Sequence, residues 1–465
     1  MLRTYQNKKQ ILEQAEKILQ KSLREVISSE EIVMVEKQIG MYRLKRKGFF
    51  GDLIEQYFFR IHPGNISEPD FIEAKVELKT TPLKSLVNGD LISKERLVFS
   101  MIPYDSVVKE TWESSSFLKK NKTLLLMFYL WINNQSILDY KFKFLYMLNL
   151  LESISQEDIY QIRKDWEYIV EKIKRGEAHL LSEGDTYYLG ACTKAKNSSV
   201  VRDQPMSSTA AKPRAFSFKQ QYINYLIQTQ LLKKKINSDS IFRKQRRIET
   251  IDTIIKEKFY PFIGQTDQYI LKRLHLNLTS DSKSYKRLLV NRILEVDTFN
   301  IAELDKANIT LRVMTLESTG NLRESISFPA FDYKNLVTQT WFDSENETMA
   351  DFHSDLETKK FLFVVFQKQK GTNDIILRKI LFWNFPMKDI GEAERVWQST
   401  IDCINDGRYD ELPKMRDSRV AHVRPHGKNS KDTIETPQRT QEMKRCFWLN
   451  AKYIQSVIES DIAQG

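Results

Sequence analysis

The sequence has 465 residues, 41% of them hydrophobic and 11% aromatic, which excludes a largely disordered chain and leaves room for two or three domains. Its 72 Lys and Arg residues against 61 Asp and Glu give a net charge of +11, which favours a polyanionic partner, nucleic acid before an acidic membrane surface. Three scattered cysteines, no apolar leader and a longest apolar run of only 124–132 predict a cytoplasmic protein with no membrane segment.

The first half of the chain alternates helical and strand-like patterns. Apolar residues at helical spacing predict helices, and apolar runs or alternation predict strands. A polar, basic loop over 191–197 separates the last two helices. The expected helices cover 8–26, 51–59, 162–173 and a last one ending at 227, and the expected strands cover 76–79, 96–102, 123–130 and 142–151.

The stretch from Asp70 to Lys79 carries the residues best suited to chemistry. Its last four residues alternate apolar and charged, so Glu77 and Lys79 share one strand face. Asp70 and Glu77 can then converge on one hard cation such as Mg²⁺, with an ammonium beside them. On these residues alone, an ordinary amphipathic edge strand explains the pattern equally well.

The second half of the sequence repeats the first. Trp112 and Trp166 of the first half have counterparts in Trp341 and Trp397, within similar surrounding patterns. The segments 214–223 and 445–454 also match at identical internal spacing. Several matches in the same order indicate two related domains.

The repeat provides a second copy of the Asp70–Lys79 stretch. Residues 74–79 align with residues 307–312, so the apolar positions of the strand persist. Glu77 is replaced by Thr310, and Lys79 is replaced by Arg312. If Glu77 is catalytic, the second domain has a nuclease-like fold that cannot cut.

These residues make the chain resemble the MutH family of DNA endonucleases, in the two-domain form of its GATC-cutting type II restriction enzymes. The resemblance spans almost the whole chain. The motifs that carry it are Lys47-Gly48-x-x-Gly51-x-x-x-Glu55, Asp70 with Glu77-Leu78-Lys79, Thr111-Trp112-Glu113, Asp165-Trp166-Glu167 and Lys194-Ala195-Lys196-Asn197.

The resemblance implies roles for five residues of the first domain. Asp70 and Glu77 would hold Mg²⁺, and Glu55 would complete the acidic cluster. Lys79 would orient or activate the attacking water. Lys120 matches a further family lysine near the scissile phosphate, with Lys119 as an alternative register.

The resemblance also implies DNA contacts. In the first domain these are Lys47, Lys194, Lys196, Asn197 and Arg214, with Lys194 the leading candidate for reading guanine or, equally, for contacting a phosphate. MutH has a Phe-Tyr pair whose tyrosine bears on adenine methylation, where this chain has Phe216-Ser217.

The loop of the second domain that corresponds to the Lys194 loop contains Arg424-Pro425-His426. Arg424 and His426 are therefore candidate DNA contacts. His422 and His426 do not predict zinc, because neither cysteine nor acidic partners accompany them. Gly427-Lys428 lacks the glycine that would make a phosphate-binding loop, so no nucleotide cofactor is expected.

We therefore expect an α+β protein of two tandem MutH-like domains of the PD-(D/E)xK restriction-endonuclease class, with mixed sheets flanked by helices. The catalytic domain would cover 1–232, a linker 233–240, and a catalytically degenerate DNA-binding effector domain 241–465.

The function expected from the resemblance is that of a type II restriction endonuclease. It would hydrolyse double-stranded DNA at GATC with Mg²⁺, as a monomer that associates into a dimer on DNA. A mismatch-repair nicking enzyme would be about half this length. A non-catalytic DNA-binding protein would not need Asp70, Glu77 and Lys79 together.

Overall fold

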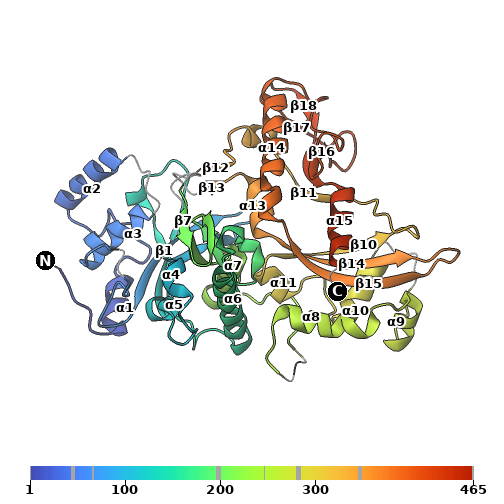
Figure 1. Cartoon of the computed structure of the whole chain (residues 1–465). Coiled ribbons are helices and arrows are strands. Elements are labelled where there is room, and N and C mark those ends of the chain that lie inside the picture. Colours follow the sequence, from blue (N-terminus) through green and yellow to red (C-terminus); the bar gives the residue numbers. More distant parts are fainter. Residues whose placement is uncertain are drawn as a thin grey trace. The chain divides into compact units, whose positions relative to one another are not determined.

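The computed structural model describes residues 2–42, 48–64, 67–194, 200–243, 245, 247–278, 284–343 and 348–462 (Figure 1). The chain divides into two compact units, one formed mainly by the residues up to Asn237 and the other mainly by those from Ser238 onward. Both units mix helices with sheets, as the α+β class requires. Within the described ranges, no helix is long and apolar enough to cross a membrane.

The first unit combines a mixed four-stranded sheet, a three-stranded antiparallel sheet and a small hairpin with flanking helices. Its elements are α1 (Lys8–Glu16), α2 (Ser29–Tyr42), α3 (Phe49–Leu53), η1 (Ile54–Phe59), β1 (Glu77–Ser85), β2 (Leu91–Ser93), β3 (Leu97–Met101), α4 (Tyr104–Val107), α5 (Ser116–Asn121), β4 (Thr123–Leu130), β5 (Phe142–Asn149), α6 (Gln156–Lys174), β6 (Leu189–Thr193), β7 (Arg202–Gln204), β8 (Ser207–Ala211), β9 (Arg214–Phe218), α7 (Gln220–Leu226) and η5 (Ile227–Leu231).

The larger sheet of the first unit has the order β2-β1-β4-β5. β1 runs parallel to β4, with Glu77 opposite Leu124. β2 pairs only with residues 83–85 at the end of β1. In the described structure, the start of β1 is therefore an open sheet edge, and Glu77 and Lys79 lie on it.

An apolar cluster connects a helix to this open edge. Leu53 and Ile54, at the junction of α3 and η1, are buried in one apolar cluster with Leu78 of β1 and Leu125 of β4. This contact fixes η1 against the strand that carries Glu77, and η1 in turn carries Glu55.

The opening helix is shorter than the sequence pattern predicts. It ends at Glu16 instead of extending to Val26. Gln20 adopts a left-handed φ of 63°, and its backbone N–H donates to the carbonyl of Phe142 at 2.8 Å. Pairing with the start of β5 thus replaces the helical hydrogen bonds. α2 then follows, with Ile32, Val35 and Ile39 at helical spacing and packed in the apolar cluster, a helix that is not among those expected from the sequence.

The second unit is built from the same kinds of element. They are α8 (Ile251–Phe259), α9 (Asp267–Arg273), α10 (Tyr285–Ile293), α11 (Ala302–Lys306), β10 (Ile309–Leu316), β11 (Ile326–Ala330), α12 (Tyr333–Leu336), β12 (Phe342–Asp343), β13 (Thr348–Met349), α13 (Asp351–Thr358), β14 (Lys360–Lys368), β15 (Ile375–Asn384), α14 (Ile390–Asn405), β16 (Ala421–Pro425), β17 (Thr433–Glu435), β18 (Gln441–Met443), β19 (Arg445–Leu449) and α15 (Ala451–Ile462).

The two units repeat one sheet topology. The order β1-β4-β5 has its counterpart in β10-β14-β15, in both cases a parallel pair followed by an antiparallel one. The order β3-β9-β6 likewise has its counterpart in β11-β19-β16. The internal repeat in the sequence therefore corresponds to a repeat in the strand order.

Buried side chains repeat as well. The rings of Trp112 and Trp166 lie 5.9 Å apart in the first unit, and those of Trp341 and Trp397 lie 5.5 Å apart in the second.

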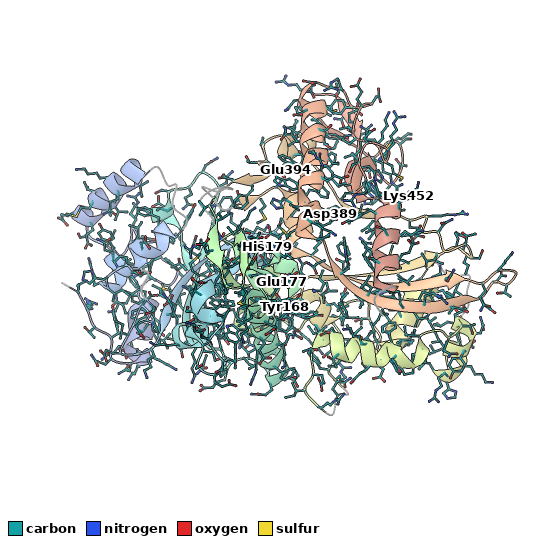
Figure 2. The ribbon with its side chains drawn as sticks, viewed as in Figure 1. Tyr168, Glu177, His179, Asp389, Glu394 and Lys452 are labelled. Carbon is teal, nitrogen blue, oxygen red and sulfur yellow. The ribbon has the colours of Figure 1, made fainter. Side chains whose placement is uncertain are left out.

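A tyrosine–aspartate hydrogen bond fixes the long helix of each unit. Tyr222 donates its hydroxyl to Asp158 of α6 at 3.2 Å. Tyr453 donates to Asp389, which precedes α14 and is labelled in Figure 2, at 2.7 Å. This hydrogen bond connects α6 to α7 in the first unit, and it connects the start of α14 to α15 in the second.

Candidate active site

A tight loop brings Asp70 and Glu77 together. Phe71 and Val76 exchange backbone hydrogen bonds of 2.9 and 3.3 Å, and Lys75 between them has a left-handed φ of 54°. The backbone N–H of Asp70 donates to Glu77 Oε2 at 3.2 Å. The N–H of Leu78 donates to Asp70 Oδ2 at 2.8 Å. Both carboxylates are therefore held by main-chain donors at the start of β1.

Two lysines face the Glu77 carboxylate. The Nζ atom of Lys79 lies 2.6 Å from Glu77 Oε1, and the Nζ atom of Lys120 lies 3.6 Å from the same oxygen. Glu77 is almost fully buried, with 2% of its side chain exposed. Lys119 instead pairs with Glu68 at an exposed position. The structure thus places Lys120, rather than Lys119, beside the acidic pair.

Glu55 lies on the π-helical turn η1, a geometry often found at functional sites. Burial, together with the charges of Asp70, Asp52 and Glu77, raises the pKa of Glu55 to about 8. Burial and the charge of Glu77 raise the pKa of Asp70 to about 7. These carboxyl groups disfavour each other's ionisation, so a cation bound beside them would stabilise their charged forms.

The donor chemistry of the site fits a hard divalent cation. Asp70 and Glu77 offer carboxylate oxygens on neighbouring backbone positions, and Mg²⁺ is commonly bound by one or two carboxylates with water and phosphate oxygens completing its shell. Among the described residues, no three His, Cys, Asp or Glu side chains form a ready-made metal cluster. Glu55 therefore stands near the acidic pair without completing a preformed three-carboxylate cage.

The second unit keeps the strand at the corresponding position but changes the side chains. Thr310 lies opposite Phe361 in β14, as Glu77 lies opposite Leu124 in β4, so Arg312 takes the place of Lys79. Lys120 lies four residues before Leu124, and Glu357 lies four residues before Phe361, so Lys120 corresponds to Glu357.

The neighbouring acidic positions change too. Asn308 repeats the left-handed φ of Lys75, at 56°, which aligns Asp70 with Glu303. Glu303 accepts hydrogen bonds from Ser240 Oγ at 2.8 Å and from the N–H of Ile241 at 3.0 Å. Arg60 follows η1 and Glu295 follows α10, and both residues have a left-handed φ. When these two residues are aligned, Glu55 corresponds to the buried Val290. Of the acidic positions of the first unit, that of Asp70 thus keeps a carboxylate in Glu303, which is engaged by Ser240 and Ile241, while those of Glu55 and Glu77 do not.

The predicted DNA contacts of the first unit have mixed outcomes. Lys194 directly follows β6 and is half-buried. Arg214 is 2% exposed and donates to the carbonyl of Ala191 at 2.8 Å. In this structure its side chain therefore connects β9 to β6 and does not face solvent, contrary to the predicted DNA contact. Lys47, Lys196 and Asn197 lie outside the described residues.

The predicted DNA contacts of the second unit are exposed, and an aromatic residue joins them. The guanidinium of Arg424 lies 3.7 Å from the ring centroid of Trp448, and His426 packs edge-on against the same ring at 5.5 Å. Sequence reasoning did not single out Trp448. The available signal was its place in the repeat, where it corresponds to Ser217 of the first unit.

Comparison with known proteins identifies the family. Residues 59–165, which include Asp70, Glu77, Lys79 and Lys120, match the family model of the DNA mismatch repair enzyme MutH. The chain is 30% identical, over an alignment 503 positions long, to the type II restriction enzyme Sau3AI of Staphylococcus aureus, covering 98% of this chain and 99% of that protein.

MutH proteins match a smaller part of the chain. The DNA mismatch repair protein MutH of Shewanella woodyi is 32% identical over 181 residues, covering 38% of this chain and 74% of that protein. MutH of an Escherichia coli strain is 28% identical over 229 residues, covering 48% of this chain and 92% of that protein. The chain therefore belongs to the Sau3AI family of type II restriction enzymes, site-specific deoxyribonucleases related to MutH.

Proposed function

We propose that this restriction enzyme hydrolyses double-stranded DNA at GATC in a Mg²⁺-dependent reaction carried out by its first domain. The observation that supports this most strongly is the group formed by Asp70, Glu77, Lys79 and Lys120 at an open strand edge. The GATC specificity rests on the resemblance to the MutH family. The same resemblance supports the choice of Mg²⁺.

Asp70 and Glu77 are the residues that would hold Mg²⁺. When bound there, the metal supplies a water of lowered pKa and neutralises charge on the phosphate oxygens. The main-chain N–H groups of Asp70 and Leu78 keep both carboxylates in fixed orientations for this task.

The two lysines provide the cationic part of the site. Lys79, half-buried beside Glu77, would orient the attacking water and stabilise the charge that develops on the phosphate. Lys120 would contact the same phosphate from the end of α5. Because both ammonium groups share one carboxylate, the incoming phosphate replaces part of their ion pairing with a second anion.

The second domain would bind a further copy of the DNA as an allosteric effector without cutting it. Thr310 and Val290 offer no carboxylate where the first domain has Glu77 and Glu55. Arg424, stacked on Trp448, presents a guanidinium whose plane is held by the ring, and such a group can contact guanine through two hydrogen bonds. His426 would add a contact beside it.

One catalytic site per chain sets the stoichiometry of the reaction. Breaking both strands requires two chains on one site or two successive nicks. We therefore infer a monomer that associates into a dimer on DNA. Comparison with MutH leaves a nicking enzyme as the second candidate, but the full-length relationship to a type II restriction enzyme favours double-strand cleavage.

The proposal is tested by digesting matched duplexes that carry GATC or the scrambled sequence GTAC. With Mg²⁺, the GATC duplex is expected to be cut in both strands and the GTAC duplex left intact. With Ca²⁺ or a chelator, neither duplex should be cut. Cleavage of one strand only would support the nicking alternative, and cleavage of GTAC would contradict the specificity.

A further inference from the structure

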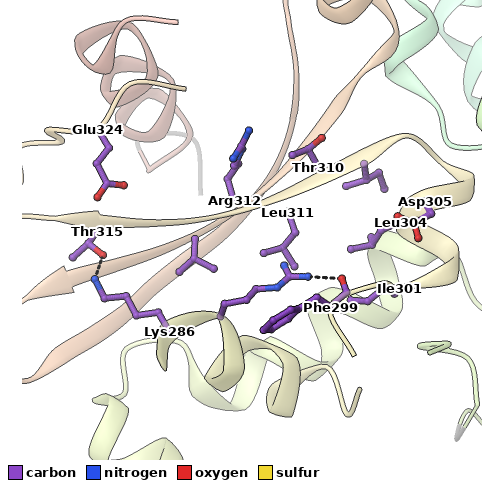
Figure 3. Close-up of a pocket in the computed structure, with 13 residues that line it drawn as sticks. Lys286, Phe299, Ile301, Leu304, Asp305, Thr310, Leu311, Arg312, Thr315 and Glu324 are labelled. Carbon is purple, nitrogen blue, oxygen red and sulfur yellow. Dashed lines mark hydrogen bonds between the residues drawn. The ribbon is translucent and has the colours of Figure 1, made fainter. Parts of the chain in front are cut away.

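The second unit contains a cavity of about 610 Å³ around the outer edge of β10 (Figure 3). β10 is the terminal strand of its sheet and pairs with β14 on its inner side. Thr310 and Arg312 project on one side of the β10 ribbon, and Lys286 of α10 lies on the other, where it donates to Thr315. The free edge of the strand therefore runs between cations from two elements.

This cavity occupies the place of the active site in the first unit. β10 corresponds to β1, and α10 corresponds to the α3–η1 segment that carries Glu55. In the first unit this edge bears carboxylates, which repel a phosphate unless a metal intervenes. In the second unit it bears Arg312 in place of Lys79 and gains Lys286 and Arg287 from the helix. The lining also contains the carboxylates of Asp305 and Glu324, so the three cations leave this location with a net positive charge, where the first unit has an acidic cluster.

The three cations use uncharged acceptors. Lys286 donates to Thr315 Oγ1 at 2.5 Å, Arg287 to the carbonyl of Phe299 at 3.0 Å, and Arg312 to the carbonyl of Ser327 at 3.3 Å. In the part of the chain that the structure describes, none of the three comes within ion-pairing distance of a carboxylate. Positive charge is therefore present without a matching anion in direct contact.

Two further observations indicate missing negative charge. The Nε atom of Arg312 is buried and has no hydrogen-bond partner among the described residues. Burial lowers the pKa of Lys286, of Arg287 and of Arg312 from their usual values. For Lys286 the charges of Glu324 and Glu317 oppose this effect, and for Arg287 the charge of Asp305 does, without overcoming it. An anion bound at this strand edge would compensate the burial of the cations on the side where it binds.

The outer edge of the strand adds suitable donors. In an edge strand, alternate backbone N–H groups point away from the sheet and are free for a ligand. The hydroxyl of Thr310 lies on the same strand face as Arg312. Backbone N–H groups, hydroxyls and guanidinium groups are the donors that proteins use to hold phosphate oxygens.

We propose that this cavity binds a phosphodiester of duplex DNA directly, without a metal ion, so that the second domain holds a DNA backbone at the location where the first domain cuts one. The proposal rests on the proposed function, in that it assigns a phosphate site to the DNA-binding second domain. The bound phosphate is not hydrolysed, because Thr310 and Val290 stand where the first domain has the carboxylates of Glu77 and Glu55.

The test measures binding of a fluorescent GATC duplex to the full-length chain in chelator, across a range of salt concentrations. The variants are Lys286→Gln, Arg312→Gln and the double substitution. The matched control is Lys370→Gln, which removes one exposed positive charge from the turn after β14. The double variant is expected to lose about tenfold in affinity and to reduce the salt dependence by roughly two counterions, while the control loses neither.

Three results would overturn the proposal. They are wild-type affinity and salt dependence in both single variants, an equal loss in the Lys370→Gln control, and a requirement for Mg²⁺ in the wild-type binding. If inorganic phosphate raises the thermal stability of the wild-type chain but not of the double variant, while DNA affinity is unchanged, the cavity is a site for free phosphate instead.

Two controls separate the possible failures. Arg312→Lys keeps the charge and is expected to retain most of the affinity. If Arg312→Gln unfolds, the half-buried Lys286→Gln on α10 decides alone. Failure of the wild-type chain to cut GATC duplexes with Mg²⁺ would overturn the proposed function. If the cavity variants bind DNA like the wild-type chain while GATC duplexes are still cut, only the present inference is overturned.

Discussion

Replacing Glu55 by glutamine is expected to stabilise the metal-free protein while lowering its cleavage rate. The pKa of Glu55 rises from 4.5 to about 8, chiefly because the carboxyl group is buried and secondly because Asp70 is nearby. The unfolded chain therefore ionises this group at a pH where the folded chain keeps it protonated. At about pH 7.5 this difference costs the folded state on the order of 2–4 kcal/mol.

The sign of the pH dependence follows from proton binding. Between the unfolded pKa of 4.5 and the folded pKa of about 8, the folded state binds more protons than the unfolded state. The free energy of unfolding of the wild-type protein therefore falls as the pH rises through this range, and the contribution levels off above it. Glutamine cannot ionise, so the advantage of the Glu55→Gln variant should grow over the same range.

The assay is thermal unfolding in chelator from about pH 5 to about pH 8, with Glu73→Gln as a matched control at an exposed carboxylate of the same unit. The unfolding temperature of the first domain in Glu55→Gln is expected to exceed the wild-type value by roughly 5–10 °C near the upper end and by little at the lower end. A variant that is no more stable at any pH, or whose advantage shrinks as the pH rises, would refute the reasoning.

Two further predictions concern the second domain and the assembly. Trp448→Leu removes the ring that holds Arg424, and a cation–π contact of this kind contributes about 1 kcal/mol. In a titration, binding of a second GATC duplex should therefore weaken roughly fivefold. Ser217→Ala, at the corresponding position of the first domain, should leave that binding step unchanged. A plasmid with one GATC site should be cut more slowly than one with two sites, because cleavage uses two chains; equal rates at all enzyme concentrations would exclude the proposed association.

Periodicity predicted the strands near the site well and the helices less well. The apolar run 123–130 is β4 without any change of bounds, because a buried central strand reads as a continuous apolar segment. The helix expected over 8–26 ends at Glu16, since a backbone hydrogen bond to Phe142, distant in the sequence, competes with it. Such a contact leaves no local pattern.

The candidate site was predictable where its residues are close in sequence. The alternation in 76–79 identified Glu77 and Lys79, and the structure adds that the loop from Phe71 to Val76 folds Asp70 back onto Glu77. Choosing between Lys119 and Lys120 required the orientation of α5, which the sequence does not contain.

Other residues needed the fold to be interpreted at all. Arg214 was predicted as a DNA contact from the resemblance to the MutH family, whereas in the structure this side chain of β9 is buried. Lys286 and Arg287 look like ordinary polar residues of an amphipathic helix in the sequence. Their place beside the edge of β10 becomes visible only when α10 packs against that strand.

The central claim is that the first domain cuts DNA and the second does not, and the matched substitutions Glu77→Ala and Thr310→Ala test it most directly. The two residues occupy the same position in corresponding strands. With Mg²⁺ and a GATC duplex, Glu77→Ala is expected to lower the cleavage rate by at least about a thousandfold, because it removes a metal ligand. Thr310→Ala is expected to lower it by no more than about fivefold, because it removes one hydroxyl donor of the proposed phosphate site and no metal ligand. Wild-type cleavage by Glu77→Ala, or loss of cleavage in a folded Thr310→Ala protein that still binds DNA, would contradict the account.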